Sequence, residues 1–152
     1  MADESAGSAL IADDLIRTLV ERARRARHRA YCPYSRFAVG AAALTTDGSI
    51  YVGCNIENAA YSETICAERV ALYKAVSEGD REVIALAVVA AGLTPPRPCG
   101  ACLQVLAELA PHATIYMAAP DGVYESAVLG DLLPAPFSLR EPSAELTGDD
   151  HQ

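Results

Sequence analysis

The chain has 152 residues, of which 51% are hydrophobic and 21% are charged. This length fits one domain with a substantial core, and the composition excludes a disordered or collagen-like chain. Twelve basic residues against 20 acidic residues give a formal net charge of −8. A surface with this charge repels phosphate backbones and anionic lipids, so we expect neither a nucleic-acid partner nor a membrane partner.

The cysteine content and the start of the chain bear on the cellular compartment. No apolar run approaches the roughly 18 to 20 residues that a membrane helix needs. The acidic, polar start MADESAGS has no basic region before an apolar run, so we predict no secretory signal and a cytoplasmic location. Five cysteines, an odd number, then favour metal or redox chemistry over a disulfide framework.

The first predicted element is an amphipathic helix over residues 10–29. Ile11, Leu15 and Leu19 fall on one side of it, and five arginines gather toward its end. Cations there complement the negative end of the helix dipole. Because the chain is acidic overall, we interpret the arginines as a solvated helix face in preference to a nucleic-acid patch.

A β-hairpin and a series of alternating helices and strands follow. Strands at residues 39–45 and 49–55 flank Asp47-Gly48, a pair that tolerates the positive φ angles of a type I′ turn. The later elements are a helix at 64–78 stopped by Gly79, a nearly all-apolar strand at 83–91, a proline-rich loop at 92–98, a helix at 100–110, strands at 113–118 and 123–128, and a polar tail after Pro134. The order α-β-β-α-β-α-β-β predicts one sheet with helices on its faces.

Three cysteines have the spacing of metal ligands. Cys99 and Cys102 form a Cys-x-x-Cys at the junction of a loop and a helix start, and Cys66 lies near the start of another helix. The thiolate is the form that binds a metal, and a helix N-terminus favours that anion. A redox dithiol uses the same Cys-x-x-Cys spacing, but the third cysteine followed by an acid favours zinc.

Three thiolates leave a tetrahedral zinc ion with one open position, which is typical of a catalytic site. None of the three histidines, His28, His112 and His151, has the spacing of a fourth ligand. Cys54 or Cys32 remains an alternative that would close the site and make it structural. We favour the open site, because a small buried thiol in a hairpin strand, as at Cys54, is ordinary.

Glu68 and Arg69 directly follow the first half of this pattern. A carboxylate beside a metal-activated water can take and return a proton, so we predict that Glu68 is the general acid–base. Three thiolates and a hydroxide outweigh the charge of zinc. An arginine beside the thiolates offsets that excess, and we assign this charge support to Arg69.

Several segments of the chain share one further pattern. They are Tyr31-Cys-Pro-Tyr-Ser-Arg-Phe37, Val39-Gly-Ala-Ala, Gly53-Cys-Asn-Ile-Glu-Asn-Ala-Ala-Tyr61, Cys66-Ala-Glu-Arg69, Pro98-Cys-Gly-Ala-Cys102 and Leu132-Leu-Pro-x-x-Phe137. Their order and content resemble the small homotetrameric zinc-dependent cytidine deaminases, and Cys-x-Glu followed by Pro-Cys-x-x-Cys is the zinc nucleobase deaminase signature. The resemblance covers roughly residues 10 to 140.

The resemblance implies a fold and a domain organisation. We expect an α/β protein with the three-layer α/β/α cytidine-deaminase-like fold, in which helices flank a mixed five-stranded sheet. The deaminase domain then spans residues 10–140, between a flexible N-terminal segment at 1–9 and a flexible C-terminal tail at 141–152.

The resemblance also implies a reaction and a ligand set. Cys66, Cys99 and Cys102 bind one Zn²⁺ per subunit, and Glu68 shuttles protons while water attacks C4 of cytosine and ammonia leaves. The products from cytidine and deoxycytidine are uridine and deoxyuridine, so the enzyme is a hydrolase acting on cyclic amidines in pyrimidine salvage. The implied partners are the nucleoside and further copies of the chain in a homotetramer with shared active sites.

Four further residues match positions that hold the nucleoside. Asn55 and Glu57 match an Asn-x-Glu that grips the ribose 3′-hydroxyl. Residues i and i+2 at a strand end face the same way, so this amide and this carboxylate can converge on one hydroxyl. Phe37 and Phe137 are the only phenylalanines in the chain and match positions that stack on or wall the pyrimidine, Phe137 from a neighbouring subunit.

Two departures and several alternatives accompany the resemblance. Leu103 stands where members usually have arginine, so we expect a rearrangement near the thiolates or the interface. Glu63-Thr64 replaces small or apolar residues, and we expect Glu63 to alter the pocket rim and with it the substrate preference. A nucleotide substrate would need cations for its phosphate, and the one lysine, Lys74, lies inside a helix.

A deaminase of a modified cytosine nucleoside, such as a blasticidin-type antibiotic, remains an alternative, although the intact Asn55-x-Glu57 favours plain cytidine and deoxycytidine. The alternative from another class is a non-catalytic, zinc-stabilised interaction domain.

Overall fold

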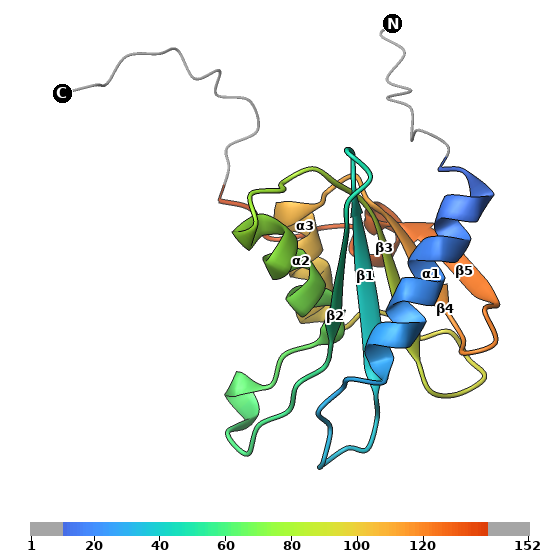
Figure 1. Ribbon diagram of the computed structural model, residues 1–152. Coiled ribbons are helices and arrows are strands. Elements are labelled where there is room, and N and C mark those ends of the chain that lie inside the picture. Colours follow the sequence, from blue (N-terminus) through green and yellow to red (C-terminus); the bar gives the residue numbers. More distant parts are fainter. Residues whose placement is uncertain (1–10, 140–152) are drawn as a thin grey trace, which may run out of the picture.

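The computed structural model describes residues 11–139, so the predicted terminal segments 1–9 and 141–152 lie outside the described residues. A five-stranded mixed sheet with strand order β2-β1-β3-β4-β5 has α1 on one face and α2 and α3 on the other (Figure 1). The elements are α1 (Asp13–Arg27), β1 (Val39–Thr45), β2 (Ile50–Cys54), η1 (Tyr61–Glu63), α2 (Ala67–Ser77), β3 (Val83–Ala90), α3 (Gly100–Leu109), β4 (Thr114–Ala118), β5 (Tyr124–Val128) and α4 (Leu129–Leu132). The predicted three-layer α/β/α fold is confirmed.

Alternating residues of the central strands serve the two faces of the sheet. On β3, Ala85 and Ala87 pack with α1, whereas Leu86 and Val88 pack with α2 and α3. Since successive side chains of a strand point to opposite faces, a strand with helices on both sides must be apolar throughout. This explains the uninterrupted apolar run that the sequence shows at β3.

The directions of the strands bring the starts of α2 and α3 together. Strand β1 is antiparallel to both β2 and β3, so β2 and β3 run in the same direction, and β3 and β4 are parallel. The carboxyl ends of β2 and β3 therefore lie at the same edge of the sheet. The segments that leave this edge lead into α2 and α3, so both helices begin there.

Helix α1 is shorter than the predicted 10–29, but its apolar side is as expected. Its buried residues include Ile16, Leu19 and Val20. On the solvent side, Glu21 forms ion pairs of 2.7 Å with both Arg24 and Arg25. Hydrogen bonds from these guanidinium groups lower the pKa of Glu21 to about 2. This arrangement agrees with the interpretation of the arginines as a solvated face.

The hairpin forms as predicted, but its turn type differs. Within the turn, Gly48 has a positive φ of 88°, whereas Asp47 is absent from the non-glycine residues of 11–139 that have a positive φ. Gly48 N donates to Thr45 O at 3.0 Å, and Thr45 N donates to Ser49 O at 3.0 Å. This is a type I turn followed by a bulged glycine, so the predicted type I′ turn is wrong. Asp47 stabilises the turn by accepting a hydrogen bond from Ser49 N at 2.9 Å.

Other differences concern short elements and helix starts. Helix α2 begins at Ala67 and not at residue 64, because Ile65 pairs with Ile56 in an isolated bridge and Cys66 is extended. Sequence reasoning missed η1 and α4, which have three and four residues.

Within residues 11–139, no helix is both long enough and apolar enough to cross a membrane.

Two glycines allow the helices to approach the hairpin closely from opposite faces. A Cβ at Gly40 would overlap the backbone oxygen of Ala23 in α1. A Cβ at Gly53 would lie 2.5 Å from Ala67 O and 2.6 Å from Ala71 N in α2. Backbone atoms of a packed helix cannot yield as a flexible side chain can. These two positions therefore set the distances of α1 and α2 from the sheet.

We predict that Gly40→Ala lowers the free energy of unfolding by about 1–3 kcal/mol or more, the range for overpacking a close-packed core. Gly130→Ala is the matched control, because a Cβ there meets no atom within 4 Å. Urea unfolding followed by circular dichroism measures both. Equal stability of the two variants would contradict the close-approach interpretation.

Candidate metal centre and substrate pocket

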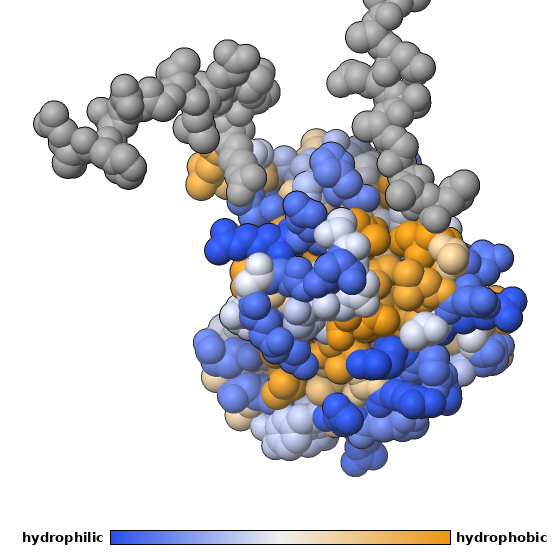
Figure 2. Space-filling model, turned by 45° about the horizontal axis from the view of Figure 1, so that its top comes forward, coloured by the Kyte–Doolittle hydropathy of each residue, from blue (hydrophilic) through white to orange (hydrophobic). Residues whose placement is uncertain are grey.

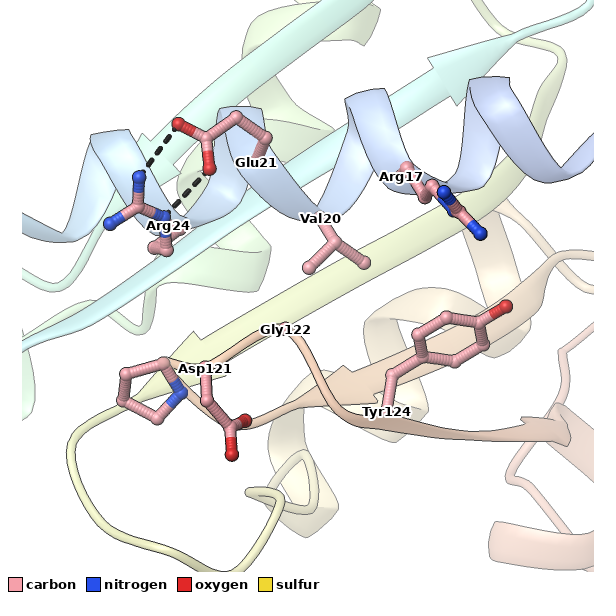
Figure 3. A pocket seen from close by; sticks show the side chains of 8 residues that line it. Arg17, Val20, Glu21, Arg24, Asp121, Gly122 and Tyr124 are labelled. Atoms are coloured by element: carbon pink, nitrogen blue, oxygen red, sulfur yellow. Dashed lines mark hydrogen bonds and ion pairs between the residues drawn. The ribbon is translucent and has the colours of Figure 1, made fainter.

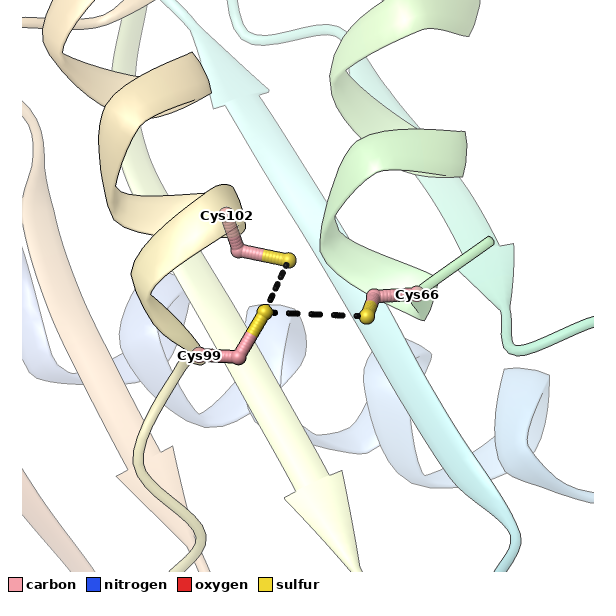
Figure 4. A group of neighbouring side chains, drawn as sticks. All are labelled: Cys66, Cys99 and Cys102. Atoms are coloured by element: carbon pink, nitrogen blue, oxygen red, sulfur yellow. Dashed lines mark hydrogen bonds between the residues drawn. The ribbon is translucent and has the colours of Figure 1, made fainter. Parts of the chain in front are cut away.

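Three cysteine sulfurs meet where α2 and α3 begin (Figure 4). Cys66 is the N-cap residue of α2, Cys99 is the N-cap residue of α3, and Cys102 lies in the first turn of α3. The Sγ atoms of Cys66 and Cys99 are 3.8 Å apart, those of Cys99 and Cys102 are 3.5 Å apart, and all three lie within 4.8 Å of one another. The structure thus brings the three predicted zinc ligands together.

The spacing of these sulfurs fits a tetrahedral zinc ion. With Zn–S bonds of about 2.3 Å, tetrahedral geometry places sulfur ligands about 3.8 Å apart. Soft thiolate donors are also those that favour zinc over magnesium or calcium. The donor set and its geometry therefore both suit zinc.

The surroundings of Cys66 favour its thiolate form. Hydrogen bonding from Cys102 is the largest cause, and together with Arg69 and Cys99 it lowers the pKa of Cys66 to about 5 against the opposing effect of burial. The pKa of Cys102 is raised, chiefly because its thiol is the hydrogen-bonding partner of Cys66 and because it is buried. A cluster that already holds negative charge at Cys66 is prepared for a cation.

No fourth protein ligand joins the cluster among residues 11–139. The one group of three or more metal-binding side chains in that part of the chain is Cys66, Cys99 and Cys102. Neither Cys32 nor Cys54 belongs to it, and burial raises the pKa of Cys54, which suits a neutral thiol. The geometry favours a site with an open position over the closed, structural alternative.

Arg69 supplies positive charge next to the sulfurs. Its Nη2 donates to Cys66 Sγ at 3.6 Å and lies 3.5 Å from Thr64 O. The Cys66 thiolate raises the pKa of this guanidinium. Among residues 11–139, the buried Nε of Arg69 has no hydrogen-bond partner. A buried donor without a partner is costly, and the adjacent Cys66 thiolate offsets that cost.

Glu68 is the one charged residue buried in the interior among residues 11–139, with 5% of its surface exposed. Burial is the main cause that raises its pKa to about 7, and the Cys66 thiolate adds to it. A carboxyl group whose pKa is near neutrality can both accept and return a proton at physiological pH. Such a group in a cavity is a candidate for catalysis.

Glu68 and two of the cysteines line one cavity of about 230 Å³. Its walls come from the end of β2, the loops before α2 and α3, and the start of β1, so segments distant in sequence meet there. The lining residues are Phe37, Val39, Asn55, Glu57, Thr64, Ile65, Cys66, Ala67, Glu68, Val88, Pro96, Arg97 and Cys99. Arg97, which sequence reasoning missed, also lies 3.4 Å from Glu125 of β5.

Asn55 and Glu57 both line this cavity, as their predicted role requires. Asn55 Oδ1 accepts from Val39 N at 2.8 Å and its Nδ2 donates to Phe37 O at 2.8 Å. One amide hydrogen of Asn55 is left for another acceptor. Glu57 accepts from Tyr34 N at 2.9 Å and from the Ser35 hydroxyl, which lowers its pKa. Main-chain and side-chain groups of residues 34–39 thus fix both side chains.

The two phenylalanines occupy different places. Phe37 lines the cavity and is 47% exposed, whereas Phe137 is 70% exposed and does not line it. The main chain of Phe137 is held by Gln104 of α3 through two hydrogen bonds of 2.8 and 3.0 Å. Within one subunit, the Phe137 ring therefore stands apart from the pocket.

The two departures from the family pattern have separate structural outcomes. Leu103 is 8% exposed and packs in the core with Leu106, and the sulfur cluster beside it is intact. Thr64 lines the cavity, and its Oγ1 accepts from Asn58 N at 3.1 Å. Glu63, the residue expected at the pocket rim, is absent from the cavity lining, and its neighbour Thr64 lies on the wall instead.

A second cavity of about 340 Å³ lies between α1 and the turn that joins β4 to β5 (Figure 3). It is lined by residues such as Arg17, Glu21, Asp121 and Tyr124, and contains none of the predicted site residues. Glu21 is already engaged with Arg24 there, as the dashed lines of Figure 3 show. The cavity at the cysteine cluster is therefore the candidate site.

Comparisons with known proteins agree with this site. Residues 14–118 match the family model described as the cytidine and deoxycytidylate deaminase zinc-binding region. A cytidine deaminase of Halalkalibacterium halodurans is 52% identical over 81% of this chain and 94% of its own length. The crystal structure of cytidine deaminase from Burkholderia pseudomallei, 44% identical, superimposes with a TM-score of 0.77 over 84% of this chain and all of that one.

The chain belongs to the zinc-binding cytidine and deoxycytidylate deaminase family. Within that family, a further relative that it resembles is the cytidine deaminase of Mycobacterium tuberculosis, 44% identical over 77% of this chain and 85% of the relative. The cofactor is zinc, in accordance with the family and with the three-cysteine cluster.

We predict that Cys99→Ala loses zinc, because the remaining two sulfurs cannot hold the ion or draw the starts of α2 and α3 together. Zinc content by elemental mass spectrometry measures this. Cys54→Ser and Cys32→Ser are the matched controls and should keep the metal. Full zinc occupancy in Cys99→Ala, or loss of zinc in Cys54→Ser, would contradict the ligand assignment.

Proposed function

We propose that the protein hydrolyses the C4 amino group of cytidine and deoxycytidine, giving uridine and deoxyuridine plus ammonia in pyrimidine salvage. The observation that carries this proposal is the meeting of the buried Glu68 carboxylate with a three-cysteine metal cluster in one cavity. The relatives from Halalkalibacterium halodurans and Mycobacterium tuberculosis are cytidine deaminases, which supports the substrate class.

The three cysteines would hold zinc, and Glu68 would handle the protons. Bound zinc supplies Lewis acidity, which makes water nucleophilic at neutral pH. Glu68 would take one proton from the attacking water and give it to N3 of the cytosine ring, and would then take the remaining proton from the oxygen added at C4 and give it to the amino group, which leaves as ammonia. Its burial supports this role, because a carboxyl group with a pKa of about 7 exchanges protons readily in both directions.

Arg69 would tune the charge of the metal site. Three thiolates on a divalent cation leave net negative charge, which weakens the acidification of water. The Arg69 guanidinium, 3.6 Å from Cys66 Sγ, withdraws part of that charge through a hydrogen bond. The N-terminal ends of α2 and α3 act in the same sense.

Asn55 and Glu57 would bind the ribose 3′-hydroxyl, and their anchored positions support this. Each already has its orientation fixed by main-chain groups of residues 34–39, so little entropy is lost on binding. The carboxylate of Glu57 has capacity for a further donor, and Asn55 has a free N–H. Together they offer an acceptor and a donor to one hydroxyl.

The pyrimidine would lie between Phe37 of one subunit and Phe137 of its neighbour in a homotetramer. The 70% exposure of Phe137 supports its contact with a neighbouring subunit. Leu93 and Leu139 also expose large apolar side chains, at 95% and 86%. Hydrophobic residues also reach the surface of the face shown in Figure 2, between hydrophilic ones. Exposed apolar surface of this kind suits contacts between protein subunits.

We further propose that residues 10–140 form the catalytic domain, which contains the family match at 14–118. We propose a cytoplasmic location, where free cysteines stay reduced. The net charge of −8 supports a neutral nucleoside as partner in preference to a polynucleotide.

We predict that Glu68→Gln keeps zinc but loses at least about 10²- to 10⁴-fold in kcat, the range for a positioned general acid–base. Loss of absorbance on cytidine measures kcat, and elemental analysis measures zinc. Glu63→Gln is the matched control, because Glu63 is a nearby carboxylate that belongs to η1 and takes no part in catalysis. This variant should keep wild-type turnover. Wild-type turnover in Glu68→Gln would remove Glu68 from the mechanism.

Glu57→Ala tests the ribose contact. A hydrogen bond to a charged group is worth about 1.5–3 kcal/mol, so KM for cytidine should rise roughly 10- to 150-fold. For 3′-deoxycytidine, which lacks the hydroxyl, the same substitution should change KM much less. An equal rise for both substrates would show that Glu57 supports the loop at 34–37 and does not contact the sugar.

Mixed oligomers test whether the pocket is shared. Phe137→Ala should weaken nucleoside binding by about 1–3 kcal/mol with the tetramer intact, because a stacking face is lost. Mixing Phe137→Ala subunits with Glu68→Gln subunits should restore some pockets that combine an intact Glu68 with an intact Phe137. A fully active monomer, or unchanged affinity in Phe137→Ala, would contradict the shared pocket.

A further inference from the structure

The side chain of Gln104 grips the main chain of Phe137 at two points. Gln104 Nε2 donates to Phe137 O at 2.8 Å, and Phe137 N donates to Gln104 Oε1 at 3.0 Å. A side-chain amide has the same donor and acceptor as a peptide group, so the pair is equivalent to one link of a β-ladder. Using both ends of the amide fixes the position of the Phe137 backbone and its direction.

Gln104 is itself mounted on a rigid element. It belongs to α3, whose residues Cys102, Leu103 and Leu106 are buried in the core on other sides of the helix. The first turn of the same helix carries Cys99 and Cys102 of the metal cluster. The amide therefore projects from a helix whose position the core and the metal site both determine.

The segment that Gln104 holds has no helix or strand of its own. Helix α4 ends at Leu132, and residues 134–139 continue without regular structure. Pro134 and Pro136 restrict the backbone on the way to Phe137. The ring then projects into solvent, with 70% of the residue exposed and no place in the cavity of its own subunit.

We propose that Gln104 is a positioning residue for the active site of the neighbouring subunit. By hydrogen bonding to the main chain of Phe137, Gln104 holds the phenyl ring where it contacts the pyrimidine bound in that site. This inference rests on the proposed sharing of Phe137 between subunits. One helix then serves two pockets, because α3 supplies Cys99 and Cys102 to its own metal centre and presents Phe137 to the next subunit.

The two hydrogen bonds from Gln104 matter because an exposed ring on an irregular segment can otherwise adopt many orientations. Without Gln104, the segment must order itself when nucleoside binds, and the lost conformational entropy subtracts from the affinity. Gln104 lies outside the cavity lining, so its loss leaves the chemistry of Glu68 and the metal untouched. The effect therefore falls on binding and not on turnover.

Gln104→Met tests the proposal, because methionine has a similar length but cannot form either hydrogen bond. In the assembled, zinc-loaded enzyme we expect KM for cytidine to rise about 3- to 10-fold, equivalent to about one net hydrogen bond. Zinc content, oligomeric state and kcat should stay as in the wild type. In the Phe137→Ala background, adding Gln104→Met should change KM by less than about twofold, because the ring that Gln104 positions is gone.

Hydrogen exchange of the Phe137 amide provides a second measurement that does not depend on activity. Gln104→Met should raise its exchange rate, while the amides of β3 in the core keep theirs. If the Phe137 amide of Gln104→Met stays as protected from exchange as in the wild type, Gln104 does not hold the Phe137 main chain. This result counts even if assembly of the variant is impaired.

The outcomes separate this inference from the proposed function. If Phe137→Ala raises KM but Gln104→Met does not, or if the two effects simply add in the double variant, the positioning role is overturned and the shared pocket stands. If Phe137→Ala leaves KM unchanged, the shared pocket itself fails, and the role of Gln104 fails with it.

Discussion

The crowding of three cysteine sulfurs at two helix N-termini is the constraint on which the rest of the structure depends. All three Sγ atoms lie within 4.8 Å of one another, so as thiolates they repel strongly unless cations are present. The helix dipoles, the guanidinium of Arg69 and a zinc ion together supply that positive charge. The antiparallel pairing of β1 with both β2 and β3 brings the helix starts to one edge, and Gly53 lets α2 approach the sheet closely.

The polar groups around this cluster lower the stability of the fold, and they provide the groups that the reaction needs. Glu68 is buried beside negative sulfurs, which is unfavourable for its charged form and raises its pKa. The buried Nε of Arg69 lacks a hydrogen-bond partner in the part of the chain that the structure describes. Groups placed at such cost mark functional sites. Asn55, in contrast, is anchored by two hydrogen bonds to main-chain groups, so this part of the pocket wall is fixed before nucleoside binds.

The sequence predicts those features that depend on residue type and local pattern. The apolar run of β3 and the cysteines at helix starts are of this kind, so the layers of the fold and the cluster of Cys66, Cys99 and Cys102 follow from them. The turn at Asp47 differs because an Asp-Gly pair fits more than one turn type, and side-chain hydrogen bonds of Asp47 decide between them. Arg97 and Gln104 carry no local signal, since their neighbours in space come from distant segments.

X-ray absorption at the zinc edge of the purified protein measures directly whether three sulfurs hold zinc at an open, catalytic position. We expect three sulfur neighbours at about 2.3 Å and one lighter oxygen neighbour at about 2.0 Å. Addition of a nucleoside that binds in the pocket should alter the oxygen shell and leave the sulfur shell unchanged. Four sulfur neighbours, with Cys54 or Cys32 recruited as the fourth ligand, would contradict the account and make the site structural.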